Sequence, residues 1–405
     1  MNLQIQKYQK VNKYIVFFAI IYVFFFPTSI NGNIIGSMWV IRNFTAIVFS
    51  VYIASVYNIQ KKKFFVAIFF ISLLSILTVT TSSFCRNNDF RVSYASLSGF
   101  IPTLIFWCII FKKNNLKGDL AIKLIHIISV ILCIWGLGLV LNNSFIISLT
   151  KNLYSQLQEN MFDNMILLRG KPVMSFGTHS MSAFFLLIVY YYNCVLIKEK
   201  KGNNFQYIYM IIFIYLETCL SSNTALLAIA IMTLLFVWSN NSTKAKLIAI
   251  FFAVLIIFYF LYTGRLYAFV NEITSGSNSE KHGIEARYFS GIYNGNFYMI
   301  SHYFGVGFLR SASNFFRMND SAIIYLFTQG NAPAVIMAYY LMYNFLKKNM
   351  CKYANISFAL FMIWELVSAS TFISPKMIFA QILTIFIINS ISTKESDVLD
   401  EFEKA

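Results

Sequence analysis

The stretch that decides the fold is Lys61-Lys62-Lys63 followed by FFVAIFFISLLSILTVTT, which ends at Thr81. The eighteen residues from 64 to 81 carry no charge and are mostly apolar. A helix of about 20 such residues crosses the hydrocarbon core of a bilayer, and lysines beside it are typical of its cytoplasmic end. The stretch therefore predicts a membrane helix that starts in the cytoplasm.

The rest of the chain repeats this pattern. Of its 405 residues, 58% are hydrophobic and only 12% are charged, whereas a soluble domain has about a quarter charged residues. Because lipid offers no partners to unpaired backbone groups, helix-length apolar segments predict a helical bundle. We therefore expect an all-α, polytopic integral membrane protein, with residues 1–405 as a single membrane domain.

Twelve segments are long and apolar enough to be predicted as transmembrane helices. They are 14–30, 37–58, 64–81, 95–111, 121–143, 179–197, 205–220, 224–239, 247–263, 321–345, 354–372 and 377–391. The stretch 205–239 also fits a single re-entrant pair. The first segment has no small-residue cleavage site behind it, so it is expected to be an uncleaved helix rather than a signal peptide.

The charged residues orient these segments. If the first segment begins on the cytoplasmic side of the membrane, the cytoplasmic regions hold 20 lysines and no arginine. Only four lysines then lie on the outer side. Lysine alone thus satisfies the positive-inside rule, with both termini in the cytoplasm. The eight arginines are all in outer loops or near the outer end of a segment: Arg42, Arg86, Arg91, Arg169, Arg265, Arg287, Arg310 and Arg317. Topology explains most of the net charge of +16, so no nucleic-acid partner is expected.

An outer face that holds the arginines predicts an anion-binding site there, because a guanidinium group binds phosphate or carboxylate through two parallel hydrogen bonds. Two extracytoplasmic loops are long, 144–178 and 264–320. Loops longer than about 15 residues are usually functional or disordered. The second loop is rich in Tyr, Phe and Gly, so we expect it to form short helices at the membrane surface.

The first long loop ends in a cluster of cationic residues. Arg169, Lys171 and His179 lie within eleven residues of one another, directly before a predicted membrane helix. One interpretation is that these side chains bind an anionic substrate. The structural alternative, in which an interfacial cation reaches the lipid headgroups, accounts for one cation more easily than for three.

The second long loop contains a longer series of candidate residues. Their order is Arg287, His302, Gly305, Gly307, Arg310, Arg317, Asn319 and Asp320, with Gly330 in the following segment. The two glycines predict a turn at which the backbone can approach a ligand. For His302 the alternative is an ordinary loop histidine, and for Asp320 it is a helix N-cap, which aspartate favours.

This order resembles the O-antigen polymerase and ligase superfamily, over nearly the whole chain and in two motifs. In 169–180 the family shows Arg and then Gly-x-Phe-x-His or Asn. In 287–330 it shows Arg, His-Pro-x-x-Gly-x-Gly, a polar residue at a helix mouth and then Gly. Here Tyr303 and Ser180 depart from the pattern, and Asn319-Asp320 stands where ligases carry His-Asn, which favours a polymerase.

The resemblance implies a GT-C-like bundle in the bacterial cytoplasmic membrane that assembles O-antigen or capsule. Such an enzyme is a glycosyltransferase that moves glycan from undecaprenyl pyrophosphate onto a second lipid-linked oligosaccharide. Donor, acceptor and membrane lipid are then its partners, together with a chain-length regulator and a flippase. The alternatives are a ligase of the same superfamily and a flippase. A flippase would carry its charges within the helices, unlike this chain.

Chemistry of this kind needs a cation at the leaving pyrophosphate, where negative charge develops. The outer loops contain no DxD pair that would hold a divalent metal, so we predict neither a metal nor any other cofactor. The predicted catalytic residues are Arg169 and Arg287 on the pyrophosphate, with His302 or Asp320 as base. The predicted substrate-binding residues are Arg42, Lys171, His179, Gly305, Gly307, Arg310 and Arg317.

Four ionisable residues lie within the apolar segments, Arg42, His126, Glu217 and Glu365. A charged group costs about 2.5–3.5 kcal/mol at the bilayer centre, so each is expected to have a partner. For the glutamates we favour structural pairing between helices. Arg42 fits either a structural pair or a contact with the lipid phosphate.

Overall fold

The structure is a computed structural model that describes most of the chain. It covers residues 2–26, 35–84, 94–111, 116, 118–176, 178–238, 243–264, 305–308, 322–367, 372 and 374–392. The described residues are almost entirely helical. The described helices before residue 144 are α1 (Asn2–Ile20) with a π-helical turn η1 (Ile21–Phe25), α2 (Ile35–Val56), α3 (Lys61–Phe84), α4 (Tyr94–Trp107) and α5 (Gly118–Val140).

The remaining helices complete a bundle with few other elements. They are α6 (Ser144–Met161) with η2 (Phe162–Leu168), α7 (His179–Lys198), α8 (Asn204–Leu220), α9 (Asn223–Met232) with η3 (Thr233–Trp238), α10 (Thr243–Tyr262), α15 (Ala322–Asn349), α16 (Ala354–Val367) and α17 (Pro375–Ser392). Two short strands, β1 (Asn58–Ile59) and β2 (Ile109–Ile110), pair antiparallel.

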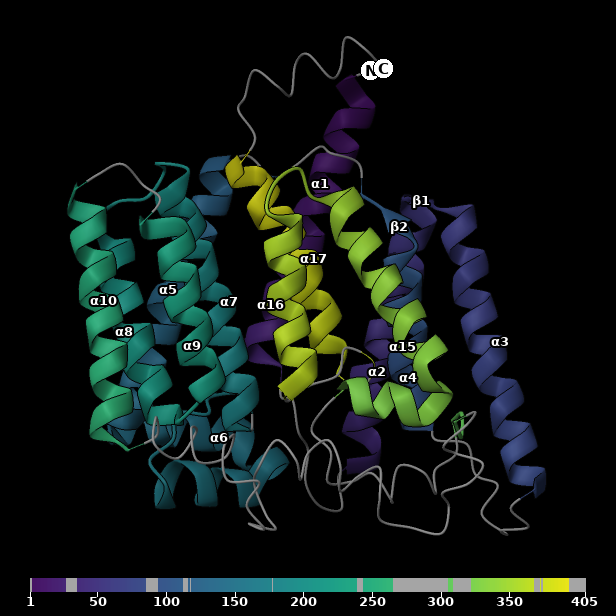
Figure 1. Cartoon of the computed structure of the whole chain (residues 1–405), viewed down its shortest axis with the longest axis horizontal. Coiled ribbons are helices and arrows are strands. Elements are labelled where there is room, and N and C mark those ends of the chain that lie inside the picture. Colours follow the sequence, from purple (N-terminus) through teal and green to yellow (C-terminus); the bar gives the residue numbers. More distant parts are fainter. Residues whose placement is uncertain are drawn as a thin grey trace.

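The apolar helices are those of a membrane-embedded protein. Among the residues that the structure describes, four helices, in α3, α5, α7 and α17, are long and apolar enough to cross a bilayer by length and composition. Each of the twelve segments predicted from the sequence coincides with a helix, although the ends differ by several residues. The stretch 205–239 forms two helices, α8 and α9 with η3, which run side by side with α7 (Figure 1).

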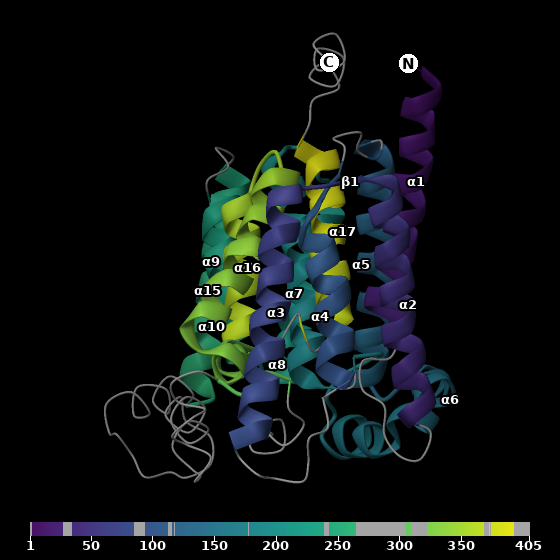
Figure 2. The same ribbon diagram turned by 90° about the vertical axis from the view of Figure 1, so that its right-hand side faces the viewer.

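Successive membrane helices run in opposite directions, so every second turn between them lies at the same end of the bundle (Figure 1). The start of α1 and the end of α17 lie at one end of the bundle. The lysine-bearing turns after α7 and α15, and the lysines that begin α3, lie at the same end. At the other end, α6 lies crosswise to the bundle in both views (Figures 1 and 2).

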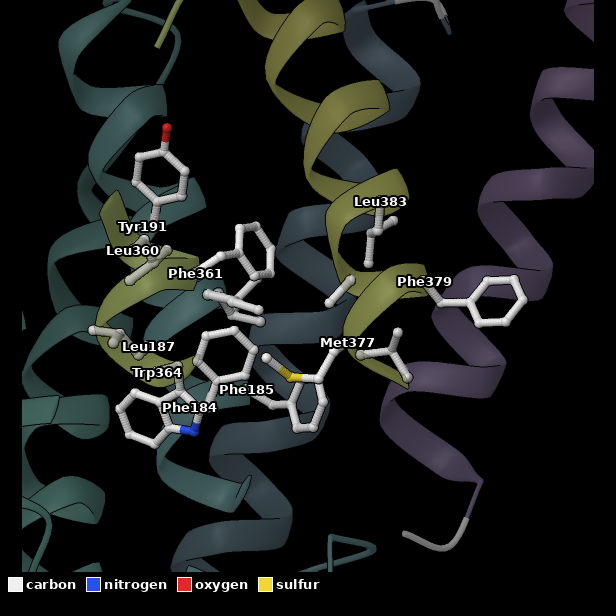
Figure 3. Packing of buried hydrophobic residues seen from close by; sticks show 14 of the residues in the cluster. Phe184, Phe185, Leu187, Tyr191, Leu360, Phe361, Trp364, Met377, Phe379 and Leu383 are labelled. Atoms are coloured by element: carbon white, nitrogen blue, oxygen red, sulfur yellow. The ribbon is translucent and has the colours of Figure 1, made fainter. Parts of the chain in front are cut away.

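The core lies around α7 and α17. In the apolar stretches of these two helices, 94% and 100% of the residues are buried. Figure 3 shows how aromatic side chains fill the space between α7, α16 and α17. The rings of Phe184 and Trp364 stack with their centroids 5.1 Å apart, and Phe361 packs against Phe184 at 5.6 Å. Aromatic contacts of this kind add to the stability that burial alone provides.

Three consecutive tyrosines of α7 fix the neighbouring helices. All are fully buried, and their hydroxyl groups bond to three different elements: Tyr190 to Thr233 at 2.5 Å, Tyr191 to Ser357 at 2.9 Å and Tyr192 to Thr384 at 2.9 Å. Because successive residues on a helix point about 100° apart, one short run of sequence can contact η3, α16 and α17. These tyrosines therefore hold the core together rather than face the lipid.

At the lysine-bearing end, Asn349 extends the small sheet. Its side-chain oxygen accepts from the backbone N–H of Phe111 at 2.7 Å, and its side-chain nitrogen donates to the carbonyl of Ile109 at 3.0 Å. The amide thus pairs with β2 as a third strand would, and ties α15 to the end of α4.

We expect Asn349→Ala to lower the free energy of unfolding by about 2–4 kcal/mol, because it leaves two buried backbone groups without partners. The measurement is the thermal unfolding midpoint in detergent. Asn344→Ala is the matched control, since Asn344 is half-buried on the same helix and its side-chain nitrogen donates to the carbonyl of Tyr340, one turn earlier in that helix. Equal midpoints for the two variants would contradict the role assigned to Asn349.

Candidate functional site

The structure describes part of the predicted site. Arg169, Lys171, His179, Gly305 and Gly307 are placed with their surroundings, and Arg42 is placed in α2 by its backbone. Five predicted residues lie outside the described residues: Arg287, His302, Arg310, Arg317 and Asp320. The helices on either side of that second long loop, α10 and α15, end and begin at the same end of the bundle as α6 (Figure 1).

The first long loop, 144–178, is mostly helical. Residue Asn142 ends α5 in the left-handed conformation, with φ of 53°, and Asn143 caps α6 by accepting from the N–H of Ile146 at 3.1 Å. Gly138 lets the two helices meet, since a Cβ there would lie 2.6 Å from Ile146. A tight turn followed by an N-cap thus starts a second helix where the sequence predicted only a loop.

Helix α6 has the character of an interfacial helix. Phe145, Leu149 and Leu153 are spaced by four residues and exposed on one face, while Thr150 and Tyr154 pack inward. An amphipathic helix that lies across the ends of membrane helices presents its apolar face to the lipid and its polar face to water. The position of α6 in Figure 2 agrees with this interpretation.

An apolar pocket of about 270 Å³ lies between α5 and α6. Its walls include Ile134, Trp135, Leu149 and Leu153. The indole N–H of Trp135 donates to the hydroxyl of Thr150 at 2.8 Å, so the polar atoms in the wall satisfy each other. Because Ile134 and Leu153 are 58% and 57% exposed, the pocket opens onto the outer surface of α5, and it suits a hydrocarbon chain.

The segment 169–178 begins where η2 ends. Gly170 has a φ of 61°, and the N–H groups of Gly170 and Lys171 donate back to the carbonyls of Ile166 and Met165, at 3.0 and 2.8 Å. This pattern is the usual helix end with a left-handed glycine. It leaves Arg169 exposed and Lys171 half-buried.

The other end of the segment 169–178 is fixed to α7. Thr178 caps this helix by accepting from the N–H of Met181 at 3.3 Å. The hydroxyl of Ser182 donates to the carbonyl of Val173 at 2.9 Å. His179 is the first residue of α7, half-buried, with a buried Nδ1 atom. The structure therefore brings the three predicted cationic residues of this loop to one end of the bundle.

Gly305 and Gly307 form a tight insert between α3 and α15. Their φ angles are +88° and +62°, and a Cβ on either would lie within 2.6 Å of backbone atoms of α15 or α3. The N–H of Gly307 donates to the carbonyl of Gln329 at 2.8 Å, and the N–H of Phe308 donates to the hydroxyl of Thr78 at 2.7 Å. Packing against protein accounts for both glycines, and contact with a ligand stays a prediction.

The insert packs where α15 is broken. Gly330 and Asn331 have non-helical backbone angles, and the side chain of Asn331 caps the continuing helix by accepting from the N–H of Ala332 at 2.7 Å. Pro333 follows, where its missing N–H is tolerated at the start of a helix. The sequence placed Gly330 inside a continuous helix, whereas the structure shows that it marks the break.

The last turn of the first helix carries a group of contacts that the sequence did not reveal. Three successive carbonyl oxygens of η1 accept hydrogen bonds from distant side chains, which we call the carbonyl clasp: Val23 from Lys376 Nζ at 3.0 Å, Phe24 from Ser175 Oγ at 2.5 Å and Phe25 from the Tyr154 hydroxyl at 2.8 Å. Carbonyls at the end of a helix have no partner within the helix. The carbonyl clasp supplies these partners and joins α1 to α17, to the segment 169–178 and to α6.

Tyr154 keeps its proton throughout the physiological range. Burial raises the pKa of its hydroxyl to about 12, because the charged form loses its hydration. It therefore remains a hydrogen-bond donor to the carbonyl of Phe25. The same tyrosine stacks on Trp135 with ring centroids 5.7 Å apart, so the carbonyl clasp and the apolar pocket share a wall.

Two of the ionisable groups within the apolar segments have partners. Tyr209 bonds to His126 Nδ1 at 2.8 Å, and Tyr339 donates to Glu365 at 3.3 Å. Structural pairing therefore accounts for both. Glu217 is fully buried, and neither of its carboxyl oxygens has a hydrogen-bond partner among the described residues, so the pairing expected for it is not found there.

The described residues contain no cluster of three or more His, Cys, Asp or Glu that could hold a metal ion. Comparisons with protein-family models, with curated proteins and with solved structures find no match to this chain.

Proposed function

We propose that the protein is a polysaccharide polymerase that transfers glycan from undecaprenyl pyrophosphate onto a lipid-linked repeat unit. The observation that carries the proposal is the position of Arg169. It is exposed in the segment between η2 and α7, soon after the interfacial helix α6 and beside a half-buried Lys171. The lysine-bearing turn that follows α7 lies at the opposite end of the bundle from the start of this helix (Figure 1). A lipid pyrophosphate at the membrane surface is the anion that such a site would meet.

In the proposed topology, twelve helices cross the bacterial cytoplasmic membrane in a GT-C-like bundle. The lysine-bearing end and both termini face the cytoplasm, in keeping with the positive-inside rule. The arginines and α6 then lie on the outer face, where the lipid-linked substrates are polymerised. The apolar pocket between α5 and α6 supports this arrangement, because it offers the carrier's hydrocarbon chain a place beside the interfacial helix.

The proposed reaction breaks the bond between the anomeric carbon of the donor glycan and the pyrophosphate oxygen, which keeps the electron pair. The acceptor hydroxyl forms the new bond to that carbon and gives its proton to His302 or Asp320. Arg169 and Arg287 stabilise the charge that develops on the pyrophosphate. No cofactor takes part in this proposal.

Analysis of the surface glycan in a strain without the gene tests this function. Loss of a polymerase leaves a single repeat unit on the carrier or its final acceptor. Loss of a ligase would instead leave long chains on undecaprenyl pyrophosphate, and loss of a flippase would leave repeat units on the cytoplasmic side. Either of the last two results, or glycan of normal length, would reject the polymerase.

A further inference from the structure

Lys376 is a fully buried cation at the start of α17. Its Nζ donates to the carbonyl of Val23 at 3.0 Å and lies 5.0 Å from the ring centroid of Phe176 and 5.7 Å from that of Phe185. The contacts come from three separate parts of the chain: the end of the first helix, the segment 169–178 and α7.

These surroundings stabilise a cation. The carbonyl ends of a helix carry partial negative charge, and the faces of aromatic rings attract a cation within about 6 Å. A well-packed apolar side chain would often be as stable as a buried charge. The lysine at this position therefore points to a role for its directed bonds, beyond filling space.

The ring of Phe176 links Lys376 to the segment that carries Arg169. The N–H of Phe176 donates to the carbonyl of Val173 at 3.0 Å, and the N–H of Val173 donates to the carbonyl of Lys171 at 2.8 Å. Residues 172–176 are all buried. A short series of turns thus connects the buried cation to the two cationic residues at the beginning of the segment.

We propose that Lys376 is a positioning residue that fixes the segment 169–178, and with it Arg169 and Lys171, over the outer end of the bundle. The inference rests on the proposed function only for what Arg169 does there. Lys376 itself is buried, so it acts through the segment and does not touch the substrate. The claim that Lys376 fixes the position of this segment can be tested without any assay of activity.

The test is a distance distribution between two nitroxide labels in vesicles. One label replaces Arg169 and the other replaces Tyr262, which is 82% exposed at the end of α10; Cys85, Cys219 and Cys351 are changed to serine. Lys376→Met should broaden the distribution roughly twofold, because local order follows the buried contacts that a segment keeps. Lys352→Met, at the lysine-bearing end, is the control and should leave the width unchanged.

A second variant covers the case in which Lys376→Met does not fold. Phe176→Leu keeps Lys376 and its bond to Val23 but removes the nearest ring, so a smaller broadening is expected. Widths equal to that of the parent in every folded variant would overturn the proposal.

The kinetic arm separates this inference from the proposed function. With defined lipid-linked repeat units in vesicles, Lys376→Met should slow transfer by roughly tenfold in the parent but by less than about twofold in Arg169→Ala, since coupled residues are not additive. Additive losses would show that Lys376 acts independently of Arg169, which contradicts positioning. If the parent transfers no glycan, the proposed function fails, and the distance measurement alone decides the role of Lys376.

Discussion

Cells in which Arg169 is replaced by alanine should carry surface glycan of a single repeat unit, with normal amounts of the protein in the membrane. Arg169 is exposed, and its neighbours in the turn are held by backbone hydrogen bonds, so its loss should not disturb the fold. Each hydrogen bond to a charged group contributes about 1.5–3 kcal/mol. If Arg169 binds the pyrophosphate as we propose, losing two such bonds should slow transfer by roughly 10²–10⁴-fold.

Two further variants sharpen the test. Arg169→Lys keeps the charge but removes the planar fork, so it should also fail if the phosphate is bound at two points. Lys151→Ala is the matched control, because Lys151 is an exposed cation on α6 that has no role in the proposed site. Glycan of wild-type length in Arg169→Ala would remove Arg169 from the mechanism. If Lys151→Ala shortens the glycan as much as Arg169→Ala does, the effect comes from surface charge in general and not from a site at Arg169.

Much of the fold could be predicted because hydropathy and charge act locally. An uncharged apolar run such as 64–81 must form a helix in lipid, and α3 extends from Lys61 to Phe84. The lysines beside these runs predicted that the start of the first helix and the end of the last helix would lie at the same end of the bundle, as they do in Figure 1. Neither inference needs knowledge of which helix packs against which.

Helix α6 was missed for a physical reason. It is amphipathic, so its average hydropathy is low, and a search for apolar segments passes over it. A search for apolar residues spaced by three and four positions would have found Phe145, Leu149 and Leu153 on one face. The capping residue Asn143, directly before this pattern, is the local signal for where the helix starts.

The carbonyl clasp and the buried Lys376 could not be predicted from local patterns. A lysine next to an apolar segment usually extends to the membrane surface, and nothing in the sequence around Lys376 distinguishes it from such a residue. Its burial depends on where α1 ends and on how the segment 169–178 folds. For the same reason the sequence did not reveal that the glycines of the second motif pack against α3 and α15.

The largest effect on stability is expected for Gly307→Ala. A Cβ at this position would lie 2.2 Å from Thr78 Oγ1, 2.3 Å from the carbonyl oxygen of Leu74 and 2.6 Å from the N atom of Thr78. The left-handed backbone adds about 1–2 kcal/mol for any residue with a Cβ, and overpacking adds about 1–3 kcal/mol. We expect a loss of about 2–5 kcal/mol, or roughly 2–6 °C in the unfolding midpoint in detergent for a chain of this length.

Gly264→Ala is the matched control for this prediction. Gly264 has a φ of +65°, close to the +62° of Gly307, but a Cβ there would meet no atom within 4 Å. The control therefore measures only the free-energy cost of the left-handed backbone for alanine. Part of this cost is offset because alanine has less conformational entropy than glycine in the unfolded state. If the two variants unfold at the same temperature, the insert is not packed against α3 as the structure shows.

A double variant identifies which contact is responsible. In Gly307→Ala with Thr78→Ala the hydroxyl at 2.2 Å is gone, but the backbone atoms of Leu74 and Thr78 remain. Because those atoms belong to α3 and cannot rotate away, the second substitution should restore little stability, and it also removes the bond from the N–H of Phe308. Full rescue would mean that the hydroxyl alone limits the space, and that the glycine is required by one side chain rather than by the contact between the insert and the helix.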